Sequence, residues 1–88
     1  MPVRVYVPSL LRPLCGGEAV VEGPAGPFGA LLRAIDQRCP GFYARMVDEG
    51  RLRPDLAVAV NGEIIQVGLH EVIPDGSEIA VVPAIGGG

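Results

Sequence analysis

Short apolar runs recur along this chain with a spacing typical of β-strands. Residues 3–7 alternate between valine and larger polar side chains, and further runs rich in valine, alanine and isoleucine occupy 18–22, 56–60, 63–65 and 78–82. Residues rich in glycine, proline, asparagine and aspartate separate these runs. The pattern therefore predicts five strands, with the valines of the first strand facing a core.

One stretch has a different period and predicts a single long helix. Phe28, Leu31, Leu32 and Ile35 repeat at three- and four-residue spacing, which places them on one face of a helix. Pro27 suits the first turn, where a missing N–H is no loss, and Pro40 is expected to end the helix. Residues 42–47 are interpreted as a short second helical turn.

The segments between these elements are expected to be turns and loops. Asn61-Gly62 is the strongest hairpin signal in the chain, and 74–76 (Pro-Asp-Gly) predicts another turn. Residues 8–17 are interpreted as a long turn and 48–55 as a polar loop.

The predicted order of strands and helix is β-β-α-β-β-β. One amphipathic helix can cover one face of one sheet, so the expected fold class is α+β. We expect the first and last strands to pair in parallel at the centre of the sheet. This is the β-grasp (ubiquitin-like) arrangement, a mixed sheet of four to five strands with one main helix packed on one face.

The outer face of this sheet is a candidate partner-binding surface. The alternate positions point outward if the helix is faced by the inward set Val3, Val5, Val58, Val60, Ile79 and Val81. Those outward positions are Tyr6, Ala57, Ala59, Ala80 and Val82. Adjacent apolar side chains on the outside of a small acidic protein favour a partner surface, whereas ordinary exposed apolar area is the alternative.

Composition narrows the class of function. The 88 residues suit one small domain, and the net charge of −3 disfavours nucleic-acid binding. No apolar run is long enough to span a membrane and no signal segment is recognised, so a cytoplasmic location is expected.

Cys15 and Cys39 form no metal-binding or CxxC pattern and are predicted to be two reduced thiols. His70, Asp75 and Glu78 show no catalytic spacing, so we expect a non-catalytic protein without a metal site.

Several motifs together resemble a known family. Val60-Asn61-Gly62-Glu63, the turn at 74–78 and the ending at 79–88 (IAVVPAIGGG) are similar to the corresponding parts of the ubiquitin-like sulfur carrier proteins. These include the molybdopterin-synthase small subunit and the thiamine-pathway carrier. The first hairpin, Val7-Pro8-Ser9-Leu10-Leu11-Arg12-Pro13 followed by Gly16-Gly17, most closely resembles the cysteine-biosynthesis carrier of mycobacterial type.

The resemblance implies a function for the C-terminal end. We expect a ubiquitin-like domain over 1–83 and a flexible glycine tail over 84–88. The Gly88 carboxylate would be adenylated by a ubiquitin-activating-type enzyme and converted to a thiocarboxylate. Ala84, Ile85, Gly86 and Gly87 would thread into the partner's active site. The partner, rather than this chain, would bind ATP and Mg²⁺.

Several functions stay open at this point. The implied acceptor is a pyridoxal-phosphate cysteine synthase, or the large subunit of molybdopterin synthase if the chain is that enzyme's small subunit. A covalent protein modifier would begin with the same adenylate. An adaptor whose tail has no chemical role is the remaining alternative.

Overall fold

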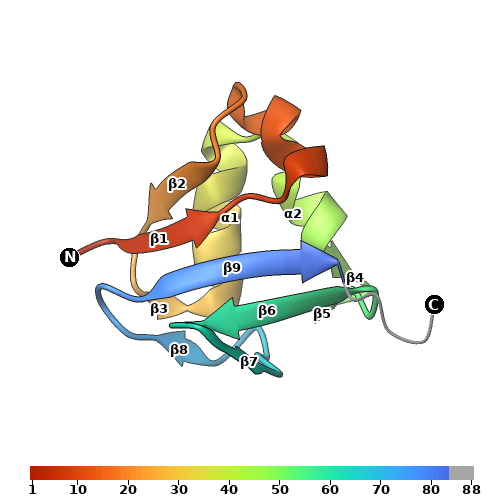
Figure 1. Cartoon of the computed structure of the whole chain (residues 1–88). Helices are drawn as coiled ribbons and strands as arrows, with labels where there is room; N and C mark the ends of the chain where they lie inside the picture. The colour runs from red at the N-terminus through yellow and green to blue at the C-terminus, as the bar shows by residue number, and fades with distance from the viewer. Residues whose placement is uncertain (84–88) are drawn as a thin grey trace.

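The mixed sheet has the predicted topology. The structure, a computed structural model, describes residues 1–83, and the predicted glycine tail lies outside them. Five strands pair in the order β2-β1-β9-β6-β7 (Figure 1). They are β1 (Val3–Tyr6), β2 (Val20–Gly23), β6 (Leu56–Val60), β7 (Glu63–Ile65) and β9 (Glu78–Pro83). β1 and β9 pair in parallel, as predicted, and the other neighbours in this sheet are antiparallel.

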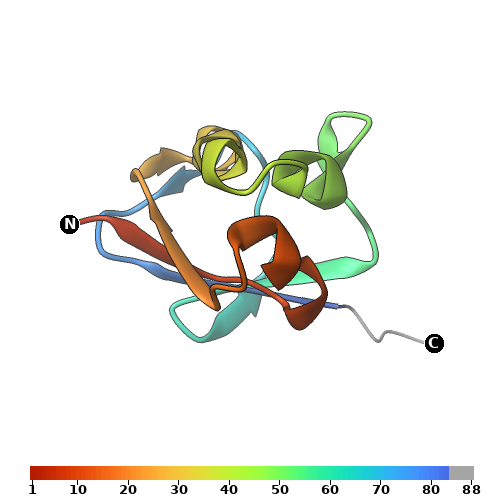
Figure 2. The ribbon, with the colours of Figure 1, turned by 90° about the horizontal axis from the view of Figure 1, so that it is seen from above.

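The helical layer lies on one side of the sheet. Figure 2 shows α1 (Phe28–Arg38) and α2 (Phe42–Met46) together on that side. The predicted apolar stripe of α1 is fully buried there, with Phe28, Leu31, Leu32 and Ile35 at 0% exposure. It packs in one core with the inward-facing side chains of the sheet, such as Val5 and Ile79. The α+β β-grasp prediction is therefore confirmed.

The start of α1 is fixed by a loop from the far end of the chain. The N–H groups of Phe28 and Gly29 donate to the carbonyl oxygens of Glu71 and Leu69, each over 2.8 Å. These two bonds satisfy N–H groups that a helix N-terminus leaves without intrahelical partners. Just before α1, β3 (Gly26–Pro27) pairs with β8 (Val72–Ile73), two short strands that the sequence pattern did not predict.

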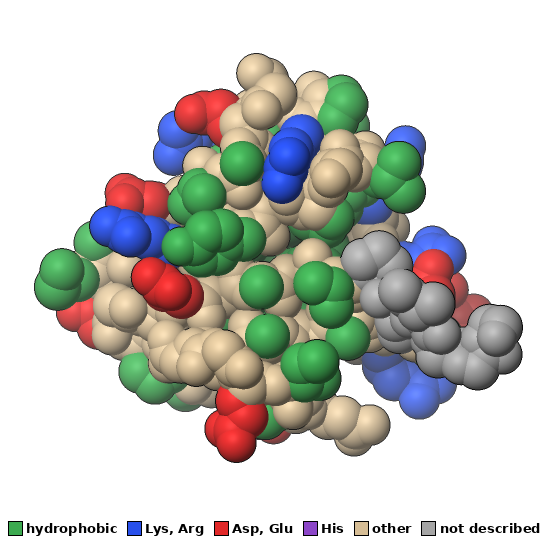
Figure 3. All heavy atoms as spheres, in the orientation of Figure 1, with side chains coloured by type: hydrophobic (Ala, Val, Ile, Leu, Met, Phe, Trp, Pro, Cys, Tyr) green, Lys and Arg blue, Asp and Glu red, His purple; other side chains and the backbone are tan. Residues whose placement is uncertain are grey.

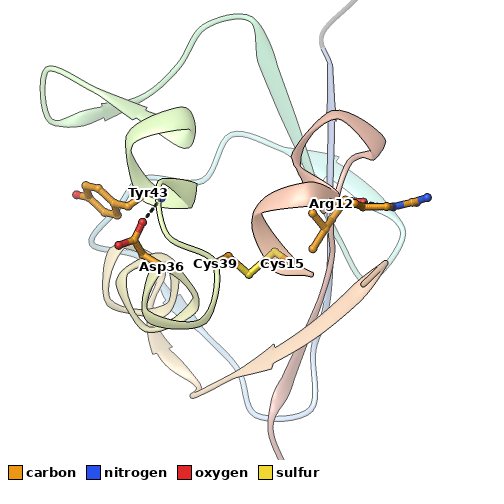
Figure 4. Close-up of a disulfide and its surroundings, with 6 residues drawn as sticks. Arg12, Cys15, Asp36, Cys39 and Tyr43 are labelled. Atoms are coloured by element: carbon orange, nitrogen blue, oxygen red, sulfur yellow. Dashed lines mark hydrogen bonds between the residues drawn. A yellow bond between two sulfur atoms is a disulfide. The ribbon is translucent and has the colours of Figure 1, made fainter. Parts of the chain in front are cut away.

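The predicted long turn at 8–17 contains a helix instead. Ser9–Cys15 forms the 3₁₀ helix η1, and its C-cap, Gly16, has the left-handed conformation (φ 65°). Its last residue, Cys15, forms a disulfide with Cys39, the C-cap of α1 (Figure 4). The prediction of two reduced thiols is therefore wrong. The fold brings the two Cα atoms within 4.4 Å although 24 positions separate them in sequence.

The predicted polar loop at 48–55 is partly ordered as a small hairpin. β4 (Val47–Asp48) pairs antiparallel with β5 (Arg51–Leu52). The turn between them holds Glu49 and Gly50 at positive φ, which reverses the chain within two residues. Among residues 1–83, no helix has both the length and the apolar character needed to cross a membrane.

Candidate partner-binding surface

Five apolar side chains form a continuous row across the outer face of the sheet. The strand register aligns Val20 with Tyr6, Tyr6 with Ala80, Ala80 with Ala59, and Ala59 with Ile64. Residues directly opposite each other on neighbouring strands point to the same face, so their side chains are neighbours. We call these five residues the apolar row. It crosses all five strands on the face opposite α1.

Three members of the apolar row have exposed side chains: Val20 and Ile64 at its two ends, and Tyr6 next to Val20. Val20 is 37%, Tyr6 39% and Ile64 68% exposed, while Ala59 and Ala80 are half-buried between their neighbours. Hydrophobic side chains gather over the middle of this face in Figure 3. A contiguous apolar patch with a polar surround is the usual mark of a protein interface.

A second row on the same face is charged. Glu22 is aligned with Arg4, and Arg4 with Glu78, two residues before the apolar row along β1 and β9. The Arg4 and Glu78 side chains approach within 3.9 Å, and both are exposed. The outer face is thus divided into a charged end, where β9 begins, and an apolar end, where β9 finishes.

The apolar end of the face is the end from which the chain leaves the sheet. Val82 is aligned with Ala57, and Pro83, the last residue of β9, is aligned with Leu56. The predicted residues Tyr6, Ala57, Ala59, Ala80 and Val82 therefore share this face, and their part in partner binding stays a prediction. Gly88 and the predicted tail residues Ala84, Ile85, Gly86 and Gly87 lie outside the described residues.

The sequence analysis did not include Val20 and Ile64 in the candidate surface, because strand register decides which residues lie next to them. Val20 stands next to the inward-facing Val21, so strand alternation already indicates that it points outward. Nothing in the sequence, however, states that it lies opposite Tyr6. Ile64 likewise gains significance only from its alignment with Ala59.

The residues with possible acid–base or metal-binding side chains occupy structural or exposed positions. Asp75 pairs with the amino group of Met1 and Glu78 with Arg4, whereas His70 lies exposed in the loop before β8. Within residues 1–83, no three His, Cys, Asp or Glu side chains lie close enough to hold a metal ion together.

The sequence and the fold are similar to those of known proteins. Residues 5–88 match the ThiS family. The sulfur carrier protein CysO of Mycobacterium tuberculosis is 31% identical over the full length of both chains. Its crystal structure superposes with a TM-score of 0.86 and 30% identity, covering 94% of this chain and 99% of the other.

Two further solved structures are similar over nearly the whole chain. One is a chain of the BexX/CysO complex of Amycolatopsis orientalis, with a TM-score of 0.86, 33% identity and coverage of 98% and 99%. The other is a putative molybdopterin converting factor subunit 1 from Pyrococcus furiosus, with a TM-score of 0.70 and 26% identity. The second match covers 97% of this chain and 99% of the other.

Proposed function

This chain belongs to the ThiS family, and on that premise we propose that it is a sulfur carrier protein for cysteine biosynthesis. The observation that carries the proposal is the division of the outer face. Its apolar row, together with the next outward-facing pair, Val82 and Ala57, lies towards the end of β9, which finishes at Pro83. A partner that takes the C-terminal end into its active site would cover this apolar end.

The proposed chemistry uses the carboxylate of Gly88. A carboxylate is a poor electrophile because its charge repels nucleophiles and its oxygens are poor leaving groups. In the proposed first step, a Gly88 oxygen attacks the α-phosphorus of ATP and pyrophosphate leaves. Sulfide then attacks the carbonyl carbon of this acyl adenylate, AMP leaves, and a thiocarboxylate results. The activating enzyme supplies ATP and Mg²⁺, and this chain supplies no catalytic residue.

In the proposal, the folded domain binds the partner and the five residues after Pro83 carry the carboxylate into the partner's active site. Five extended residues after Pro83 span at most about 17 Å. That length carries the carboxylate well away from the sheet while the folded body stays outside the partner's active site. Small residues suit the passage, since glycine has no side chain to clash with a narrow channel.

The choice of client rests on the full-length similarity to CysO. The solved complex of BexX with CysO supports a role in which the folded body binds another protein. A second candidate function, the small subunit of molybdopterin synthase, is favoured by the likeness to the Pyrococcus furiosus protein. We rank this second function below the first because the match has a lower identity and a lower TM-score than the matches to the CysO structures. The Cys15–Cys39 disulfide does not support the expected cytoplasmic location, because disulfides are rare in cytoplasmic proteins outside hyperthermophiles.

Mass spectrometry of the C-terminal peptide tests the proposal. The chain is incubated with the ubiquitin-activating-type enzyme of the same organism, ATP and sulfide. We expect the mass increase produced when one sulfur replaces one oxygen, confined to the peptide that contains Gly88. The increase should be absent without ATP and in a chain that lacks residues 87–88. An unchanged mass in the complete reaction would refute the proposed chemistry.

Offering the sulfurated chain to two acceptors separates the two client assignments. Loss of sulfur from the carrier in the presence of a pyridoxal-phosphate cysteine synthase and its amino-acid substrate, measured with formation of cysteine either free or joined to the carrier, supports the leading assignment. Transfer only to the large subunit of molybdopterin synthase supports the second assignment and contradicts the first.

A further inference from the structure

A small groove lies between η1 and the end of β9. It has a volume of about 360 Å³, and its walls include Tyr6 of β1, Leu10 and Arg12 of η1, and Ala80 and Val82 of β9. We call it the η1 groove. Tyr6 and Ala80 also belong to the apolar row, so the groove continues the apolar end of the outer face. Leu10 is 86% exposed at its rim.

Among residues 1–83, the guanidinium of Arg12 makes one hydrogen bond, which leaves its Nη groups without a protein partner there. Its Nε donates to the carbonyl oxygen of Val7 over 3.1 Å, and the side chain is half-buried. Figure 4 shows it extending away from the disulfide. Within residues 1–83, only Arg4 and Arg53 contact a carboxylate, so Arg12 shares the lack of an ion pair with the remaining arginines and differs from them by lining the groove.

The element that carries Arg12 is fixed at both ends. The N–H of Leu11 donates to the carbonyl oxygen of Pro8 over 2.9 Å. The N–H of Gly17 donates to the carbonyl oxygen of Arg12 over 2.8 Å. Cys15 is joined to the C-cap of α1 by the disulfide. A groove wall that is already ordered loses little conformational entropy on binding. The bond from Nε to Val7 holds the guanidinium of Arg12 beside this ordered wall.

We propose that the η1 groove binds a segment of the activating enzyme in which an aspartate or glutamate follows or precedes an apolar side chain. The carboxylate binds the Nη groups of Arg12, whose planar fork suits two parallel hydrogen bonds. The apolar side chain contacts Tyr6, Leu10 and Val82. This inference rests on the proposed function, because the enzyme that receives the residues after Pro83 must lie beside Val82, one residue earlier.

Binding of the purified activating enzyme to the full chain, measured by isothermal titration calorimetry, tests the inference. Arg12→Glu should raise the Kd by about tenfold or more, because it replaces an attractive charge pair with a repulsive one. Arg12→Lys keeps the charge but loses the fork and the bond to Val7, so a smaller increase is expected. Arg38→Glu, an exposed change at the end of α1, makes the same change in net charge and should alter the Kd by less than about twofold.

Leu10→Glu provides a variant that cannot disturb the core, because Leu10 is almost fully exposed. It places a negative charge at the rim of the η1 groove and should also raise the Kd. Equal effects of Arg12→Glu and Arg38→Glu would show that only net charge matters and would overturn the inference. Unchanged binding of both groove variants would overturn it too, as would weakened binding confined to the sulfur-acceptor enzyme.

Mass spectrometry of the C-terminal peptide, carried out at a saturating concentration of the activating enzyme, reports the sulfur transfer independently of the binding affinity. The two measurements together distinguish failure of the groove inference from failure of the proposed function. If the unaltered chain gains sulfur but the groove variants bind the enzyme normally, the groove inference fails and the sulfur-carrier proposal stands. If the unaltered chain binds the enzyme through Arg12 yet never gains sulfur, the docking site stands and the proposed chemistry fails.

Discussion

Asn61 joins two parts of the sheet through one side chain. It begins the turn between β6 and β7 with φ 52°, and Gly62 follows with φ 86°. Both positive values are required by this kind of hairpin turn, and asparagine tolerates them better than most residues. Its Oδ1 also accepts a hydrogen bond from the N–H of Glu78 over 2.9 Å, at the start of β9. The residue therefore helps to place the strand that leads to the C-terminal end.

Replacing Asn61 should separate these two contributions. We expect Asn61→Ala to lower the free energy of unfolding by about 1–2 kcal/mol, because it loses the acceptor and strains the turn. Asn61→Gly loses only the acceptor and keeps the positive φ at no steric cost, so its loss should be smaller. Urea denaturation followed by circular dichroism measures both values. Equal losses for the two variants would contradict a role for backbone conformation at this position.

The short elements are where the sequence was least informative. The long helix and the five main strands were predictable because their apolar side chains repeat at clear periods over a buried face. η1 was not, since Pro13 and the turn residues around it suggested a loop. The two-residue strands β3 and β8 are too short to show any period. Their pairing is decided by contact between segments that are distant in the chain.

The disulfide between η1 and α1 should contribute strongly to stability. In the unfolded chain it closes a loop with a sequence separation of 24, which limits the conformations available to that state. For a loop of this size the expected contribution is about 3–4 kcal/mol. The double variant Cys15→Ala/Cys39→Ala should lose about that much, as measured by urea denaturation. Alanine is preferred to serine here because a buried hydroxyl would add its own desolvation cost.

Thermal unfolding with and without dithiothreitol provides the matched control for the disulfide. The reductant should lower the midpoint of the unaltered chain towards that of the double variant, and should leave the variant unchanged. A reductant effect of equal size in both proteins would show that the loss has another origin.

At the scale of the molecule, the site depends on strand register more than on residue type. The sequence pattern correctly indicated that Tyr6, Ala57, Ala59, Ala80 and Val82 face outward, because strand alternation decides the face. It could not place Val20 and Ile64 in the same row, nor Arg12 beside Val82. Those neighbours follow from pairing between strands and from the position of η1, which local patterns do not encode.

A charge placed in the middle of the apolar row should disable the surface without unfolding the domain. Ala80 lies between Tyr6 and Ala59 on the outer face, away from the core. Ala80→Arg should therefore change the thermal midpoint little, since the long side chain can extend into solvent. It should weaken binding of the activating enzyme by about tenfold or more, because a desolvated charge without a partner is costly in an interface. Calorimetric titration measures this loss.

Ala44→Arg is the matched control for that change. Ala44 is exposed on α2, in the layer on the other side of the sheet, so the same substitution there should leave the Kd unchanged (Figure 2). If Ala44→Arg weakened binding as much as Ala80→Arg, the loss would not be specific to the outer face, and that face would not be assigned as the docking surface. If neither variant affected binding, the apolar row would have no part in docking.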